Sequence, residues 1–181
     1  MSQKHLHSIH VSHYKHTAGC ATEVMPIPDV VKISMSQHIG APCKPLVQKG
    51  DYVKVGELIA EQDGAVSSPV YASVSGTVTK TEDILLSNGT FAPAIYIESD
   101  GLMNVYENIA PPVINERADF IKAIKDSGVV GLGGAGFPTV VKLTVKNLDQ
   151  IQCVIINCAE CEPYVTSDTR AMLDYDFDVI G

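Results

Sequence analysis

Hydrophobic and polar residues alternate in short stretches over the first half of the chain. One lysine separates Val31 from Ile33 and another separates Val53 from Val55, which is the period-two pattern of half-buried strands. Turn-forming pairs divide these stretches, namely Lys49-Gly50, Asp63-Gly64, Ser75-Gly76 and Asn88-Gly89. The pattern therefore predicts a small all-β unit, which we assign to residues 29–105.

The pattern becomes helical after a connection that contains two consecutive prolines. Phe120, Ile121 and Ile124 form an apolar stripe at helical spacing. Asn115 is the predicted N-cap, and Gly128 takes the position of a C-terminal left-handed residue. This segment predicts one amphipathic helix.

A second apolar run predicts a strand. Residues 151–156 are mostly β-branched and apolar, which is typical of a buried parallel strand. Ligands of open α/β sheets bind beyond the carboxyl ends of the strands, where Asn157, Glu160 and Glu162 would lie. With the preceding helix, the run predicts the opening of an α/β domain in residues 106–181.

Between the predicted helix and strand lies a segment that is rich in glycine. Four glycines occur within residues 131–136, and Pro138 and Lys142 follow. Backbone without Cβ atoms can approach an anion closely, and a helix beginning near Pro138 would add its positive end. The segment predicts a phosphate cradle. It also satisfies G-x-G-x-x-G, but a helix rather than a strand precedes it, which disfavours an ordinary Rossmann fold.

The composition restricts the class of protein. The chain has 181 residues, of which 45% are hydrophobic, and a formal net charge of −8. This acidity disfavours nucleic acid and anionic membranes as direct partners. The chain has neither an apolar run of about 18 residues nor a signal peptide, so we expect it to be soluble and intracellular, with no direct membrane insertion.

Histidines and cysteines provide only weak signals of a metal site. Five of the six histidines occur within residues 1–28, which we interpret as an irregular, solvated lead-in with a metal site as the alternative. Cys158 and Cys161 form a single C-x-x-C pair. We interpret them as small packing residues, and a redox pair or half of a metal site is the alternative.

The glycine segment and the predicted strand end carry a resemblance to a known family. Residues 131–143 and 157–168 resemble the C subunit of Rnf-type electron-transport complexes. They are more distantly similar to the flavin-carrying, NADH-oxidising subunit of respiratory complex I. The similarity extends to residues 36–42 and 72–78, so it covers most of the chain.

The β unit resembles the barrel-sandwich hybrid of lipoyl and biotinyl carriers, on the residues from Lys49 to Gly56, Ser68 to Val70 and Ser75 to Val78. Carriers of this fold present a modifiable lysine on a turn, but the corresponding residues 63–69 contain none. A carrier function is therefore disfavoured. The fold class implied is mixed β and α/β: a lipoyl-like barrel-sandwich hybrid domain followed by the start of a complex I-type FMN-binding α/β domain.

The resemblance implies a set of cofactor-binding residues. The glycine loop would wrap the FMN phosphate and ribityl chain, Lys142, Asn157 and Glu160 would face the flavin, and Phe137 and Glu162 would face NADH. The full set is Gly131, Gly133, Gly134, Gly136, Phe137, Lys142, Asn157, Glu160 and Glu162. The alternatives are a glycine cluster that only permits close packing, a phenylalanine of the core and glutamates of a solvated rim.

The resemblance also implies a function. The full protein would pass electrons from NADH through FMN to [4Fe-4S] clusters, whose cysteine motifs belong to a C-terminal part that is absent here. The partners would be the other subunits of a membrane-associated complex, which implies a cytoplasmic location at the inner face of the cell membrane. The alternatives are a non-catalytic docking or scaffold module and the electron-feeding subunit of an amino-acid reductase. We expect residues 1–181 alone to be inactive as an oxidoreductase.

Overall fold

The computed structural model describes residues 11–157 and 159–174. The chain divides into two compact units. One combines Met1–Met25 with Gln150–Gly181, and the other covers Pro26–Asp149.

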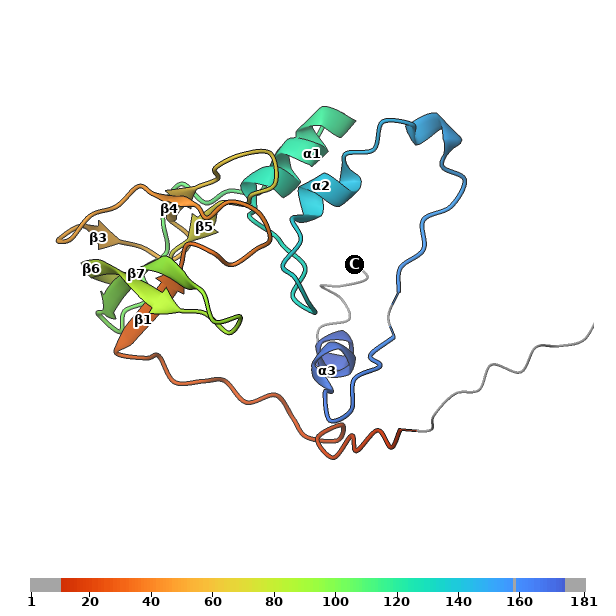
Figure 1. Ribbon diagram of the computed structural model, residues 1–181, viewed down its shortest axis with the longest axis horizontal. Helices are drawn as coiled ribbons and strands as arrows, with labels where there is room; N and C mark the ends of the chain where they lie inside the picture. Colours follow the sequence, from red (N-terminus) through yellow and green to blue (C-terminus); the bar gives the residue numbers. More distant parts are fainter. Residues whose placement is uncertain (1–10, 158, 175–181) are drawn as a thin grey trace, which may run out of the picture. The chain divides into compact units, whose positions relative to one another are not determined.

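The β part of the second unit consists of two antiparallel sheets (Figure 1). The larger sheet has the order β1-β7-β6-β3 and the smaller one β2-β4-β5. Their strands are β1 (Val30–Ser34), β2 (Lys44–Pro45), β3 (Tyr52–Val53), β4 (Leu58–Glu61), β5 (Val70–Tyr71), β6 (Gly76–Leu85) and β7 (Phe91–Ser99). The predicted all-β unit is confirmed.

The core of this part draws on both sheets. Val53 and Val78 come from the larger sheet and Ile59 from the smaller one, and each is at most 1% exposed. The period-two pattern explains this burial, because alternate residues of a strand point to the same face. Ile33 is buried as predicted, whereas Val55 lies outside the strands and forms only an isolated bridge with Val105.

The predicted helix is α1 (Arg117–Asp126), and Gly128 follows it with a φ of +72° as expected. The N-cap prediction is one residue wrong, because Glu116 rather than Asn115 caps the helix. The Asp119 carboxylate, three residues further on, accepts the Glu116 N–H at 3.2 Å and so closes a capping box there.

Within the residues that the structure describes, three short helices follow α1. They are α2 (Thr139–Leu143), the 3-10 helix η1 (Leu148–Gln150) and α3 (Ser167–Asp174). The helix expected from Pro138 is α2, with Pro138 at its N-cap, but it is only five residues long. No helix in the described residues is long and apolar enough to cross a membrane.

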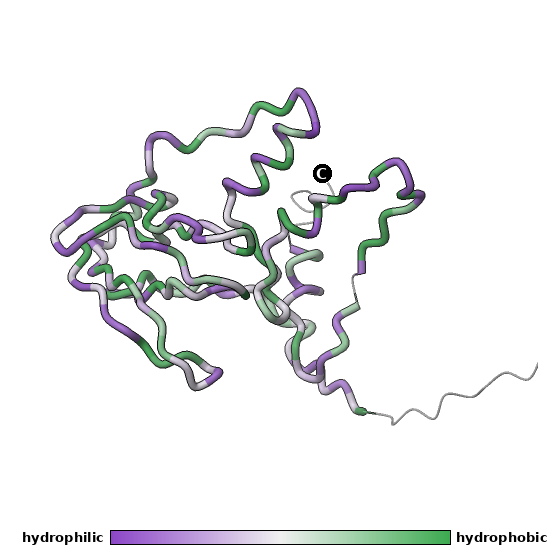
Figure 2. The backbone as a smooth tube through the Cα atoms, turned by 45° about the horizontal axis from the view of Figure 1, so that its top comes forward, coloured by the Kyte–Doolittle hydropathy of each residue, from purple (hydrophilic) through white to green (hydrophobic). Residues whose placement is uncertain are grey.

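The strand predicted at residues 151–156 is wrong for this structure. Val154, Ile155 and Ile156 are 83%, 86% and 82% exposed and belong to no strand. Figure 2 shows them within a continuous hydrophobic stretch of backbone. A parallel strand needs a neighbouring strand for its hydrogen bonds, and none within residues 11–157 and 159–174 pairs with this stretch. These apolar residues, whose composition predicts burial, are therefore exposed to solvent in this structure.

Candidate functional site

The glycine segment forms a loop that is closed at its base. Val130 and Pro138 pair as an antiparallel bridge, and the Gly131 N–H donates to the Phe137 carbonyl at 3.0 Å. Residues 132–135 form an exposed turn between these contacts. The exposed backbone is held in place from both sides, as a cradle for a ligand requires.

Two of the glycines border open space. A Cβ atom on Gly133 or Gly134 would meet no atom within 4 Å, and neither residue has a positive φ. The fold itself therefore does not need glycine at these two positions. Because a ligand can approach glycine backbone more closely than any other, the open space fits an anionic group such as a phosphate.

Lys142 and Phe137 lie next to this loop. The Lys142 ammonium is 5.9 Å from the centre of the Phe137 ring, and a Cβ on Gly131 would be 3.4 Å from its Nζ. Lys142 is exposed and Phe137 is half-buried. The structure thus brings a positive charge and a flat apolar ring to one side of the loop, and such groups can attract an anion and stack on an aromatic ring.

Gly136 has a different surrounding from the other glycines. Its φ is +65°, and a Cβ there would lie 2.6 Å from the Gln37 carbonyl oxygen and 2.9 Å from the His38 Cα. The Ile39 N–H donates to the Gly136 carbonyl at 3.3 Å. Gly136 therefore lets the loop pack directly on residues 37–39 of the barrel-sandwich part. Gly136 thus allows close packing, which was the alternative interpretation of the glycine cluster, whereas Gly133 and Gly134 border open space.

His38 forms a buried hub beneath this contact, which the sequence patterns did not predict. The Ser68 N–H donates to its Nε2 at 3.1 Å, so this nitrogen carries the lone pair. Its Nδ1 lies 3.1 Å from the Ile39 carbonyl and is therefore the protonated nitrogen. Cys43 lies 3.3 Å from Nε2, and burial raises the pKa of its thiol. The only sequence signal was the position of His38 within the stretch 36–42.

The contacts of His38 also involve the turn at residues 63–69, which corresponds to the turn that presents the modifiable lysine in carriers. Ser67 and Ser68 belong to the turn at residues 63–69, and both are buried against His38 and Cys43. The second half of this turn therefore packs against the segment that supports the glycine loop, while Gly64 and Ala65 at its tip remain exposed.

A cavity of about 420 Å³ adjoins the glycine loop on the side of the barrel-sandwich part. Residues 134–136, 36–39 and 86–88 line it, the last of these from the connection between β6 and β7. Ser36, Gln37, Ser87 and Asn88 give its wall hydroxyl and amide groups without a charge. The barrel-sandwich part thus contributes one wall beside the loop.

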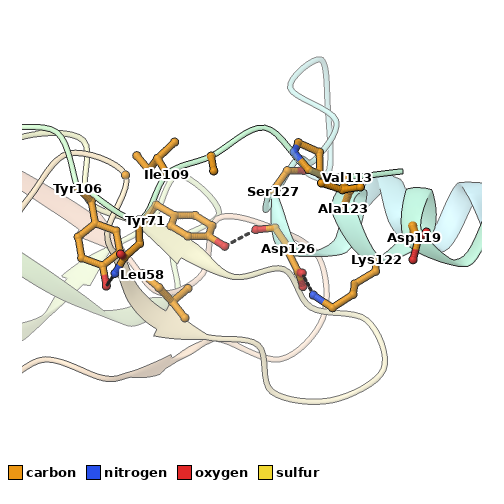
Figure 3. Close-up of a pocket in the computed structure, with 14 residues that line it drawn as sticks. Leu58, Tyr71, Tyr106, Ile109, Val113, Asp119, Lys122, Ala123, Asp126 and Ser127 are labelled. Carbon is orange, nitrogen blue, oxygen red and sulfur yellow. Dashed lines mark hydrogen bonds and ion pairs between the residues drawn. The ribbon is translucent and has the colours of Figure 1, made fainter. Parts of the chain in front are cut away.

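Another cavity, of about 800 Å³, lies between β4, β5, the connection and α1 (Figure 3). It is lined mainly by apolar and aromatic side chains, including Leu58, Tyr106, Ile109 and Val113. It contains none of the predicted cofactor-binding residues.

The contact across this cavity fixes the end of α1. The Tyr71 hydroxyl donates to the Asp126 carbonyl, as Figure 3 shows. A Cβ on Gly128 would be only 2.7 Å from the Pro69 carbonyl oxygen, so α1 ends directly on the strand region of β5. Together with Gly136, this contact attaches the glycine loop to the barrel-sandwich part on both sides.

The other three predicted residues belong to the first unit. The Asn157 Oδ1 accepts the Ala159 N–H at 3.0 Å, a turn of the asparagine type. Glu162 is exposed, and its carboxylate has no hydrogen bond or ion pair in the described part of the chain. Cys158 lies outside the described residues, as do His5, His7 and His10, and Cys161 is exposed. The structure therefore gathers residues 131–142 in one unit and residues 157–162 in the other.

Glu160 caps helix α3. Its carboxylate accepts the Asp168 N–H and the Thr169 hydroxyl, both at 2.8 Å, and lies 3.7 Å from the Lys15 ammonium. Burial raises the pKa of Glu160, but these hydrogen bonds and the lysine charge outweigh it, so the pKa is lowered overall. The carboxylate therefore has a structural role at the helix N-terminus, and its contact with flavin stays a prediction.

Acid should release this cap. Because the pKa of Glu160 is lower in the folded chain than in the unfolded chain, its stabilising contribution is present above the usual glutamate pKa of about 4.3. It is lost as the pH falls through the folded value. We expect the protection of the Asp168 amide against hydrogen exchange, measured relative to its intrinsic exchange rate at the same pH, to fall below pH ~4 in the parent chain. In the variant Glu160→Gln, this protection should already be lower at neutral pH and should not fall further with acid, and equal protection profiles would contradict the capping role.

These features define the class of the protein: a barrel-sandwich hybrid domain that packs against an exposed glycine loop. Comparison with family models gives the particular family. Residues 4–102 match the RnfC barrel sandwich hybrid domain, and residues 124–181 match the Nuo51 FMN-binding domain. The chain belongs to the RnfC family, so both the predicted resemblance and the predicted fold class are confirmed.

Curated relatives agree with this family. The chain is 47% identical over 148 residues to the C subunit of the Na(+)-translocating ferredoxin:NAD(+) oxidoreductase complex of Acetobacterium woodii. The aligned residues cover 80% of this chain and 33% of the relative. It is 44% identical over 171 residues to the C subunit of the proton-translocating ferredoxin:NAD(+) oxidoreductase complex of Clostridium ljungdahlii, with coverages of 92% and 37%. It is 37% identical over 175 residues to the C subunit of the ion-translocating oxidoreductase complex of Rhodobacter capsulatus, with coverages of 91% and 33%. The chain spans about a third of the length of the curated relatives it matches.

Proposed function

We propose that this chain forms the N-terminal part of an Rnf-type C subunit that binds FMN and NADH. The subunit passes electrons from NADH through FMN to [4Fe-4S] clusters in the remaining part of the protein, and its partners are the other subunits of the complex. One observation carries this proposal: the exposed glycine loop, with Lys142 and Phe137 beside it, lies within the residues that match an FMN-binding domain. The names of the relatives, which contain ferredoxin and NAD(+), support it.

Five of the predicted site residues have a proposed task. Gly133 and Gly134 leave room for the FMN phosphate at their backbone, and Lys142 balances its charge. Phe137 offers a face for the nicotinamide ring, and Glu162 accepts hydrogen bonds from hydroxyl or amide groups of NADH. Bound FMN would supply the change from two-electron to one-electron chemistry.

The barrel-sandwich domain supports the site in this proposal. Its residues 37–39 hold Gly136, and its Tyr71 holds the end of α1. We place this domain at residues 29–105 and the start of the FMN-binding domain at residues 106–181. A non-catalytic docking module and an amino-acid reductase subunit are the competing functions, and flavin binding excludes the first.

Flavin titration tests the proposal. We expect residues 1–181 to bind FMN weakly, because the apolar residues 154–156 are exposed and no strand among the described residues pairs with them. Purified chain would be titrated with FMN while flavin fluorescence is followed. In parallel, a full-length form would be made, in which residues 1–181 are followed by the C-terminal two thirds of the Clostridium ljungdahlii relative.

The full-length form should be yellow, and NADH should bleach its flavin band. A full-length form that folds but takes up no FMN would contradict the proposal. Tight stoichiometric binding by residues 1–181, with bleaching by NADH, would show instead that these residues already form a complete site.

A further inference from the structure

Lys15 is surrounded by the backbone of the segment that carries Glu160 and Glu162. Its ammonium donates to the Glu160 carbonyl at 3.2 Å, to the Glu162 carbonyl at 2.9 Å and to the Val165 carbonyl. An ammonium has three N–H donors, so these three carbonyls satisfy all of them. The Lys15 side chain is only 24% exposed. A surface lysine that is free to move would not show this set of partners.

Residues next to Lys15 in the N-terminal segment contact the same stretch, residues 159–166, which we call the acidic loop. The Tyr164 N–H donates to the His13 carbonyl at 2.8 Å, and the Tyr14 and Tyr164 rings stack at 5.4 Å. The hydroxyl groups of Thr17 and Thr166 lie 2.7 Å apart. Residues 13–17 therefore pack along the acidic loop, although they are separated from it by about 145 to 150 positions in the sequence.

The acidic loop has no regular secondary structure of its own. Residues 159–166 belong to no helix or strand, and Tyr164 has a φ of +68°, which is unusual for a residue with a side chain. Three carbonyl oxygens that converge on one point repel one another unless a cation lies between them. Lys15 therefore determines the conformation of this backbone.

The two glutamates of the acidic loop differ in what their carboxylates do. Glu160 is occupied by the N-terminus of α3, whereas Glu162 is exposed and lacks a partner within the described residues. Its own carbonyl is the one that Lys15 binds at 2.9 Å. Lys15 thus fixes the backbone from which the free carboxylate extends.

We propose that Lys15 is a positioning residue, which holds the Glu162 carboxylate in place for a nicotinamide nucleotide. This inference rests on the proposed function, because it takes Glu162 as an acceptor for NADH. In this inference the N-terminal segment, which the sequence predicted to be an irregular, solvated lead-in, supports the nucleotide site. Arginine would not replace Lys15, because a planar guanidinium cannot direct three donors at three converging carbonyls.

The test compares Lys15→Met, Glu162→Gln and the double variant in the full-length form, with Lys44→Met as the matched control. Lys44 makes an exposed ion pair with Asp63 in the barrel-sandwich part, with side chains 62% and 44% exposed. Flavin content, kcat and KM for NADH would be measured with an artificial electron acceptor. Lys15→Gln, which keeps a donor, serves as the second variant if the methionine variant does not fold.

We expect Lys15→Met to raise the KM for NADH about 10-fold, because the variant loses a charged hydrogen-bond donor that holds Glu162 but does not itself contact the ligand. Flavin content and kcat should stay close to those of the parent. The double variant should be no worse than Glu162→Gln, because Lys15 acts through Glu162. Lys44→Met should behave like the parent.

Three outcomes would overturn the inference: an unchanged KM in Lys15→Met, effects that add in the double variant, or a loss of flavin that parallels the loss of NADH affinity. A parent full-length form that binds no flavin, or whose flavin NADH does not reduce, would instead refute the proposed function and this inference with it. The parent protein therefore distinguishes the two failures.

Discussion

Replacing Gly136 by alanine should release the glycine loop from the barrel-sandwich domain. A left-handed φ of +65° disfavours alanine, and its Cβ would lie 2.6 Å and 2.9 Å from backbone atoms of Gln37 and His38. Strain and overpacking together should cost roughly 3 kcal/mol. Backbone atoms cannot move aside as the end of a flexible side chain can, so the loop itself has to shift.

The Ile39 amide reports this release directly. It donates to the Gly136 carbonyl at 3.3 Å, so its hydrogen exchange should accelerate about 100-fold in Gly136→Ala. Amides of the buried β7 strand should keep their protection. Unchanged exchange at Ile39 would show that Gly136 does not anchor the loop.

Gly133 provides the matched comparison, because it lies in the same loop without a positive φ and without a neighbour within 4 Å of its Cβ position. Gly133→Ala and Gly133→Val should leave Ile39 exchange unchanged. In the full-length form the valine should abolish flavin retention, because its side chain occupies the space proposed for the phosphate. Full flavin content in Gly133→Val would remove the cradle assignment.

Phe137→Ala combined with Glu162→Gln should weaken NADH binding far more than FMN binding. The pair removes one stacking face and one charged acceptor, which together should cost on the order of 2 to 4 kcal/mol of NADH binding. Neither residue is expected to touch the FMN phosphate. Dissociation constants for both ligands in the full-length form would measure this separation.

Phe120→Ala is the control for the loss of an aromatic ring. Phe120 lies on α1, is 41% exposed and is not part of the glycine loop. This variant should change neither affinity. Equal weakening of NADH and FMN in the Phe137 and Glu162 variant would show that the two sides of the site are assigned wrongly.

The sequence by itself determined the local architecture of this protein. Alternation around Val31 and Ile33 was enough for the β unit, and Gly128 marked the end of α1 correctly. Such features depend on residues within two to four positions of one another, so periodicity and turn chemistry reveal them. The residues of the glycine loop and of the stretch 157–168 were enough to recognise the RnfC family.

Boundaries and burial needed more than local pattern. The N–H groups of Asn115 and Glu116 both donate to Asp119, and Glu116 is the cap because its own side chain accepts the Asp119 N–H in return. The apolar composition of residues 151–156 favours burial, but these residues can form a strand only where a neighbouring strand is available to pair with them.

Only the tertiary structure decided what the individual site residues do. Gly133 and Gly136 look alike in the sequence, yet one faces open space and the other packs on the backbone of Gln37, about a hundred positions away. Likewise, no local pattern links Lys15 to the Glu162 carbonyl, 147 positions later, because such a contact arises from packing rather than from periodicity. Long-range packing therefore separated the glycine that anchors the loop from those that face open space. It also separated the glutamate that caps a helix from the one whose carboxylate has no partner in the part of the chain that the structure describes.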